Sequence, residues 1–185
     1  MSVKSNKEIS QYLTFKLEDD LYALNVEGVQ EVLELELNHI TKIPRTPAFL
    51  RGVINVRGSV VPVIDMHIKF NMGKQETTVD TCIIVIETIL SGKTTILGIL
   101  ADSVQEVIDL EPEQIEAAPE IGNQLKTEFI AGIGKRDDRF IIILKIDEIL
   151  TAEELSVVDT PAYPDLDANQ ISTEQDKILK TVSAT

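Results

Sequence analysis

Short alternating and continuous apolar stretches dominate the chain and predict β-strands. Leu13, Phe15 and Leu17 alternate with more polar neighbours, which is the period of a strand with one buried face. Residues 82–86 and 140–144 are continuous apolar runs instead. These runs are too short for helices of usual length and are rich in isoleucine, so they fit strands that are buried on both faces.

Two further apolar runs, residues 53–56 and 60–64, flank a turn and predict a β-hairpin. The turn contains Gly58, which supplies the positive φ angle that tight hairpin turns need. Pro62 lies inside the second run and has no N–H for a strand ladder, so we expect an edge strand or a bulge there. Asp65 and Asp147 each precede a short apolar stretch, which predicts that their carboxylates cap helical turns.

The chain contains an internal repeat. The tetrapeptide Val29-Gln30-Glu31-Val32 recurs without change 75 residues later, at positions 104–107. Residues 49–53 match residues 129–133 at an offset of 80, and residues 63–65 match residues 145–147 at an offset of 82. The order of the matches is kept and the offset drifts slowly, as short loop insertions would produce.

This repeat predicts the fold class and the domain organisation. Each repeat is a unit of roughly 70 residues made of short strands, which suits a small closed barrel because closure removes unpaired edges. We therefore expect an all-β protein in which residues 11–70 and 81–150 form two barrels related by a pseudo-twofold axis, within one domain over residues 11–158. We expect residues 1–10 to be a flexible amino terminus and residues 159–185 to be a mostly disordered tail.

Charge and composition narrow the classes of function. Seventeen basic and 31 acidic side chains give a formal net charge of −14. Such a chain repels phosphate backbones and anionic lipid heads, so we expect no nucleic-acid partner and no direct membrane binding. The first ten residues are polar, unlike a signal peptide, and no apolar run approaches the roughly 18 residues that span a bilayer. The expected location is the cytoplasm.

The sequence lacks a catalytic constellation. The single cysteine, Cys82, is interpreted as a small buried hydrophobe, and His39 and His67 as surface residues without metal-binding spacing. The acidic pairs at 19–20 and 137–138 fit hairpin turns better than a calcium site. We therefore expect a protein that is not an enzyme and that has no metal and no cofactor. The function class that is left is recognition of a partner in a cleft between the barrels. The alternative function is a small-molecule-binding β-barrel.

Residues 47–65, with the sequence PAFLRGVINVRGSVVPVID, resemble the signature of CheW-type domains. Residues 22–32, 97–104 and 138–144 continue this resemblance, which covers about residues 11–158. It implies two SH3-like, five-stranded barrels and an adaptor function. Proteins of this family couple the cytoplasmic tip of chemoreceptors, the methyl-accepting chemotaxis proteins, to the regulatory domain of the histidine kinase CheA. From the length of the chain we expect no receiver or kinase domain of the kind that some relatives carry.

The resemblance also implies site residues. Val29, Glu31 and Arg57 fall where the family contacts the receptor, and Gly52 falls where kinase contact is sensitive. Each residue has a structural alternative: a core position for Val29, an ion pair for Glu31 and Arg57, and backbone geometry alone for Gly52. Our hypothesis is that Arg57 pairs with Glu31 and with polar groups of the receptor.

Overall fold

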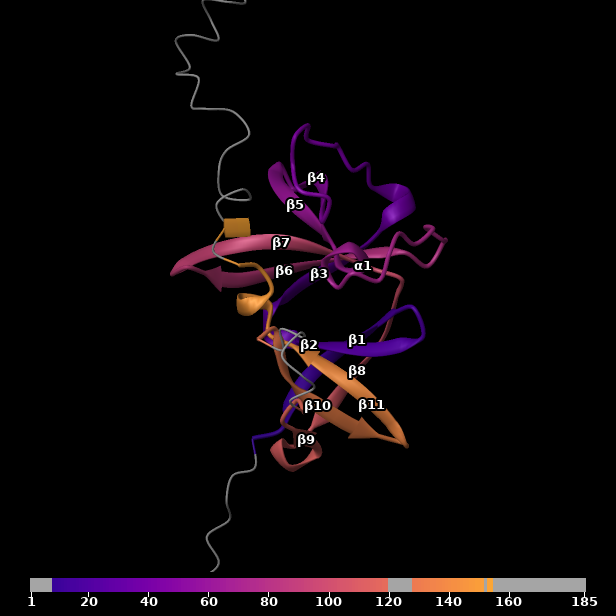
Figure 1. Cartoon of the computed structure of the whole chain (residues 1–185), viewed down its shortest axis with the longest axis vertical. Helices are drawn as coiled ribbons and strands as arrows, with labels where there is room; N and C mark the ends of the chain where they lie inside the picture. Colours follow the sequence, from indigo (N-terminus) through magenta and orange to yellow (C-terminus); the bar gives the residue numbers. More distant parts are fainter. Residues whose placement is uncertain (1–7, 120–127, 152, 155–185) are drawn as a thin grey trace, which may run out of the picture.

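The computed structural model describes residues 8–119, 128–151 and 153–154, which form two curled β-sheets, one above the other (Figure 1). Most of the predicted flexible amino terminus and the whole predicted tail lie outside the described residues. No helix within the described ranges is long and apolar enough to cross a membrane. The strands and the one named α-helix are β1 (Ser10–Leu17), β2 (Asp20–Asn25), β3 (Val29–Glu34), β4 (Leu50–Val56), β5 (Ser59–Asp65), α1 (Met66–Lys69), β6 (Cys82–Leu90), β7 (Lys93–Ala101), β8 (Ser103–Leu110), β9 (Ile115–Glu116), β10 (Ile130–Arg136) and β11 (Arg139–Leu144).

The two sheets confirm the predicted all-β fold with two barrels. One sheet, which we call barrel I, has the strand order β3-β6-β7-β5-β4. The other, barrel II, has the order β8-β1-β2-β11-β10-β9. Its sixth strand, β9, has only two residues and pairs with β10 through Glu116 and Ile133. Barrel I has an isolated bridge between Thr41 and Val53 at the equivalent place, so the barrels share one architecture.

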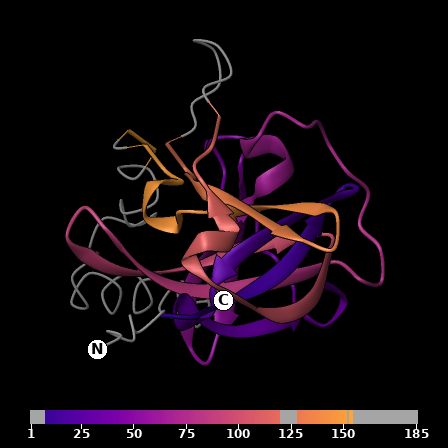
Figure 2. The same ribbon diagram turned by 90° about the horizontal axis from the view of Figure 1, so that it is seen from below.

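The barrels do not coincide with the two sequence repeats, contrary to the predicted division at residues 11–70 and 81–150. The β1–β2 hairpin of the first repeat belongs to barrel II, where β2 pairs in parallel with β11 (Figure 2). The β6–β7 hairpin of the second repeat belongs to barrel I, where β7 pairs in parallel with β5. The repeats have matching strands, so a hairpin from either repeat fits the same place. The two halves of the chain thus exchange their first hairpins.

The register of the strands explains why these sequence segments are repeated. A β-bulge lies between Val29 and Glu31 where β3 pairs with β6, and the second copy of this tetrapeptide lies opposite the irregularity between Leu13 and Phe15 in the β1–β8 pair. Leu50 and Gly52 flank another bulge, and their counterparts 80 residues later flank an equivalent one. The repeated segments therefore lie at the irregular places of the strand ladders.

The offset of 82 for residues 63–65 is wrong. The N–H of Asp65 donates to the Phe49 carbonyl at 2.7 Å, and the N–H of Lys145 donates to the Phe129 carbonyl at the same distance. Lys145 is therefore the counterpart of Asp65, and the offset stays at 80. As predicted, the Asp65 carboxylate caps α1, where it accepts from two backbone N–H groups. Asp147 caps nothing, because it lies inside the 3-10 turn Ile146–Glu148.

The predicted hairpin turn is confirmed, but Pro62 does not lie in an edge strand. Val56 pairs with Ser59, so the loop consists of Arg57 and Gly58, both with positive φ angles of 52° and 87°. Pro62 faces Val53 of β4, and the parallel pairing of β5 with β7 begins only at the next residue, Val63. The missing N–H thus falls just before the second ladder starts, which allows a central strand to contain proline.

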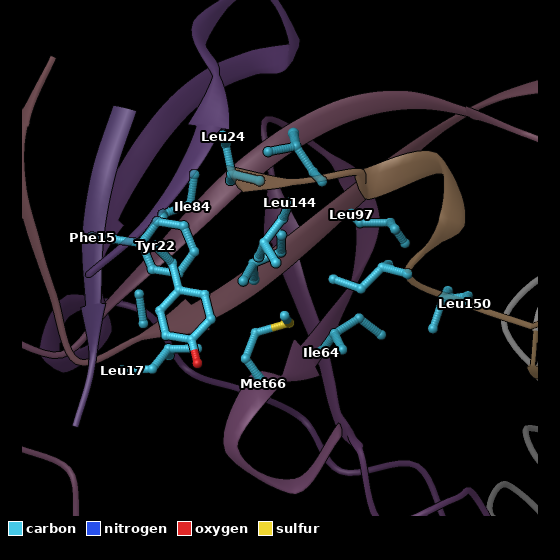
Figure 3. Packing of buried hydrophobic residues seen from close by; sticks show 14 of the residues in the cluster. Phe15, Leu17, Tyr22, Leu24, Ile64, Met66, Ile84, Leu97, Leu144 and Leu150 are labelled. Carbon is cyan, nitrogen blue, oxygen red and sulfur yellow. The ribbon is translucent and has the colours of Figure 1, made fainter. Parts of the chain in front are cut away.

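Buried side chains form one core inside each barrel and a larger one between them. Figure 3 shows part of the larger one. Strand β6 is apolar on both faces, as its continuous run predicts: Ile83 and Val85 point into barrel I, whereas Ile84 and Ile86 belong to the cluster between the barrels. We call this cluster the central core. Its largest fully buried members are Phe15, Leu17, Leu24, Ile64, Met66, Ile84, Ile86, Leu90, Leu97 and Ile99.

Replacing Gly52 by alanine should destabilise the fold strongly. Gly52 has a φ angle of 146°, and an added Cβ would lie 2.3 Å from the Thr41 carbonyl oxygen, so the Thr41–Val53 bridge must open. We expect a loss of at least about 2 kcal/mol in the free energy of unfolding, measured with urea. The control is Gly73→Ala, where φ is also positive but the space is open, with an expected loss of about 1 kcal/mol. Equal effects would contradict the steric explanation.

Candidate functional site

A groove of about 260 Å³ lies at the junction of the two barrels. Barrel II contributes Leu24 and Asn25 from the end of β2, and barrel I contributes residues of β6. The floor is apolar and the rim is charged. The lining residues are Leu24, Asn25, Gly28, Ile86, Glu87, Thr88, Leu144, Lys145, Ile146 and Asp147. An open groove of this kind suits a peptide or helix better than an enclosed small molecule.

Val29 lies at the edge of this groove. Its Cα faces that of Ile86, a groove residue, across the β3–β6 ladder. The side chain is partly buried and packs against the central core. Val29 is therefore partly a core residue, which was the structural alternative for it, but it also has exposed surface next to the groove. A bulge follows Val29, so that the next paired residue, Glu31, faces Val85 of β6.

Glu31 and Arg57 form the predicted ion pair. The Arg57 guanidinium lies 3.6 Å from the Glu31 carboxylate, and their side chains are 84% and 25% exposed. Arg57 reaches β3 from the β4–β5 hairpin loop, where two consecutive positive φ angles set the direction of the loop. An exposed pair of this kind contributes only about 0–1 kcal/mol to folding. Most of the Arg57 side chain remains exposed to solvent.

The second barrel shows that this ion pair is not a requirement of the architecture. The counterparts of Glu31 and Arg57 are Glu106 and Asp137, at offsets of 75 and 80. Both line one surface pocket of barrel II, and both are acidic. Asp137 lies 3.9 Å from its neighbour Arg136, and Arg139 lines the same pocket. Barrel II therefore forms the same strands without an ion pair between these two positions. This favours recognition over structural need for Arg57.

Gly52 is not part of the exposed surface. It lies in the middle of β4 and is buried beneath the Thr41 backbone. It has no side chain to offer, so the close backbone approach explains the glycine fully. An effect of Gly52 on a partner would have to act through the position of residues 40–42 and of its neighbour Arg51.

His67 is buried, so its interpretation as a surface residue is wrong, whereas His39 is exposed. The Nε2 atom of His67 lies 2.7 Å from an Asp102 carboxylate oxygen, and its Nδ1 atom has no hydrogen-bond partner among the described residues. The other Asp102 oxygen accepts from the backbone N–H of Glu18 in the β1–β2 turn. This link ties α1 of barrel I to a hairpin of barrel II. The sequence offers no signal for it beyond the position of His67 in a capped turn.

The described residues contain no group of three or more histidine, cysteine or acidic side chains that could hold a metal ion. The interiors of both barrels are filled by side chains, including Ile54, Val63 and Val85 in barrel I and Ile108 and Ile141 in barrel II. This packing does not support the alternative of a small-molecule-binding barrel. Cys82 is buried, as predicted. Burial raises the pKa of its thiol to about 11.

Known proteins are similar to this chain in sequence and in fold. The family model of the CheW-like domain matches residues 11–154. The chemotaxis protein CheW of Klebsiella aerogenes is 36% identical over 152 residues, which are 82% of this chain and 88% of that protein. CheW of Helicobacter pylori is 30% identical over 147 residues, 80% and 85% of the two chains. The crystal structure of the scaffolding protein TtCheW from Thermoanaerobacter tengcongensis is similar with a TM-score of 0.68 at 36% identity, over 78% of this chain and 94% of that chain.

Cys82 should be almost unreactive in the folded protein. With a pKa of about 11, only about 0.1% of the thiol is ionised at pH 8, and the thiolate is the reacting form. We expect the reaction with 5,5′-dithiobis(2-nitrobenzoate) at pH 8 to be at least about a hundredfold slower in buffer than in 8 M urea. A fast stoichiometric reaction of the folded protein would show that Cys82 is accessible.

Proposed function

This chain belongs to the CheW-like domain family, and from this membership we propose that it couples the cytoplasmic tip of chemoreceptors to the regulatory domain of the histidine kinase CheA. The related proteins are chemotaxis proteins and a scaffolding protein, so the role is that of a chemotaxis scaffold. In this role the protein acts in the cytoplasm, binds both partners and catalyses no reaction.

The observation that carries the receptor part of the proposal is the exposed Arg57 next to the groove-edge strand β3. The receptor surface that we propose comprises Val29, Glu31 and Arg57. Val29 provides an apolar contact beside the groove, and Glu31 holds the Arg57 fork over β3. An arginine fork suits carboxylates and carbonyl oxygens of a partner. The absence of this pair at the equivalent place in barrel II supports a role outside folding.

The kinase part of the proposal concerns the region around Gly52. Because Gly52 is buried, we propose that it acts indirectly by holding the Thr41 segment against β4. A substitution there would move the segment and disturb a kinase contact without touching the kinase. The proposed receptor and kinase surfaces are different parts of barrel I, so we expect both partners to bind at once.

The scaffold role predicts simultaneous binding. Purified protein should bind the kinase regulatory domain and a receptor-tip fragment separately, and should co-elute with both in size-exclusion chromatography when all three are mixed. A mixture that yields only the two binary complexes would contradict the separation of the surfaces. Failure to bind either partner alone would exclude the adaptor function.

Reversal of the exposed arginine should separate recognition from stability. In Arg57→Glu, the new carboxylate stands beside Glu31 and opposite the partner, where like charges cost several kcal/mol. We expect receptor-tip affinity, measured by calorimetry, to fall at least about tenfold, while the free energy of unfolding changes by no more than about 1 kcal/mol.

The matched control is Arg139→Glu, which makes the same change of charge next to the hairpin loop of barrel II. It should leave receptor affinity unchanged. A large loss of stability in Arg57→Glu would favour a structural role for the ion pair. Equal receptor affinity for the wild type and Arg57→Glu would refute the recognition role.

A further inference from the structure

Each barrel contains one parallel strand pair, and the two pairs are counterparts of each other. In barrel I, Val63 of β5 faces Gly98 of β7, and in barrel II, Ile143 of β11 faces Ala23 of β2. The β5 and β11 residues are 80 positions apart, and the β7 and β2 residues are 75 positions apart. These are the two offsets of the repeat, so they also relate the residues that follow each strand.

The same offsets identify the counterpart of the groove between the barrels. His67 of α1 corresponds to Asp147, which lines the groove. Asp102, between β7 and β8, corresponds to Glu27, between β2 and β3. Two places related by a pseudo-twofold axis lie on opposite sides of it, and Figure 1 shows α1 to the right of the junction and the golden turn after β11 to the left. The junction thus has the groove on one side and the His67–Asp102 contact on the other.

The two sides of the junction differ in whether their residues attract each other. On the groove side, Glu27 and Asp147 are both acidic and both exposed, and two ionised carboxylates cannot form a hydrogen bond with each other. On the opposite side, Met66 of α1 is fully buried, and His67 Nε2 lies 2.7 Å from an Asp102 carboxylate oxygen. The architecture is therefore open on one side and closed by α1 on the other.

Both residues of the closed side are firmly attached to their own barrel. The second Asp102 carboxylate oxygen accepts from the Glu18 N–H at 2.7 Å, and the Asp102 N–H donates to the Lys16 carbonyl at 3.0 Å. The His67 N–H donates to the Asp65 carboxylate at 3.0 Å, within the cap of α1. The His67–Asp102 contact, which we call the clasp, therefore joins barrel I to the β1–β2 turn of barrel II.

The clasp supplies a direction that the central core lacks. Burial of apolar surface is non-directional, so the central core holds the barrels together without fixing the angle between them. A hydrogen bond weakens steeply when donor and acceptor leave the line. The His67 side chain is only 4% exposed, so opening the clasp leaves a buried ring nitrogen without its partner, which is costly. The clasp thus favours one angle between the barrels.

We propose that the clasp sets the relative orientation of the two barrels and thereby the width of the groove on the other side of the junction. His67 and Asp102 are then positioning residues for a groove that neither of them lines. With the clasp closed, the barrels are drawn together at α1 and stand apart at the groove. With the clasp open, a small hinge motion about the central core narrows the groove. The proposal concerns the free protein and holds for any partner of the groove.

The test is a measurement of residual dipolar couplings of the backbone amides in the ¹⁵N-labelled full chain, which report the relative orientation of the barrels directly. In the wild type, one alignment tensor should fit both barrels. The variant His67→Leu has a side chain that cannot donate. We expect separate tensors for its barrels, rotated against each other by more than the fitting error, and shifted amide signals of Asn25, Thr88 and Lys145 in the groove.

Two controls separate the clasp from a general loss of stability. His67→Gln keeps an N–H donor for Asp102 and should restore a single tensor. Ile54→Ala removes apolar contacts inside barrel I, so it should lower stability and leave the orientation unchanged. An unchanged orientation and unshifted groove signals in His67→Leu would overturn the proposal, and so would an equal rotation in Ile54→Ala.

A second variant decides the question if His67→Leu does not fold. Asp102 is 30% exposed, and Asp102→Asn keeps only one acceptor oxygen for the two donors, His67 and Glu18. Its barrels should rotate in the same direction as in His67→Leu, by a smaller angle. A folded Asp102→Asn protein with the wild-type orientation would show that the clasp does not set the groove.

Discussion

The exchange of the first hairpins between the two repeats determines the rest of this structure. Because β1 and β2 complete barrel II and β6 and β7 complete barrel I, neither half of the chain encloses a barrel by itself. The central core between the barrels is the consequence, since one face of several exchanged strands packs there. A stack of aromatic rings packs in this core. The ring centroids of Tyr22 and Phe70 are 5.9 Å apart, and those of Phe70 and Phe129 are 4.7 Å apart. Each such contact adds about 0.5–1.5 kcal/mol beyond burial.

A shared core gives a scaffold what it needs, which is a fixed geometry between binding surfaces. The groove has walls from both barrels, so its width depends on how the barrels pack. The His67–Asp102 contact ties the barrels together at α1. The loop with Arg57 follows directly after β4, and β4 is held by its pairing with β5 and by the Thr41–Val53 bridge. Partners that bind these places would therefore be held at a constant distance from each other.

The sequence was sufficient to predict the strands, the two barrels and the ion pair between Glu31 and Arg57, because these depend on local periodicity, on the repeat and on a family resemblance. It was not sufficient to predict which strands share a barrel, because matching repeats make a hairpin from either half fit equally well. The burial of His67 also escaped prediction, because its partner Asp102 is 35 residues away.

The claim that the barrels share one core is tested most directly by native-state hydrogen exchange in low concentrations of urea. Amides of β1 and β2 in barrel II and of β6 and β7 in barrel I should open with the same free energy and the same urea dependence, because an exchanged hairpin cannot leave one barrel without exposing the central core. Opening of barrel II at a clearly lower free energy, with β6 and β7 still protected, would contradict this account and show two barrels that fold independently.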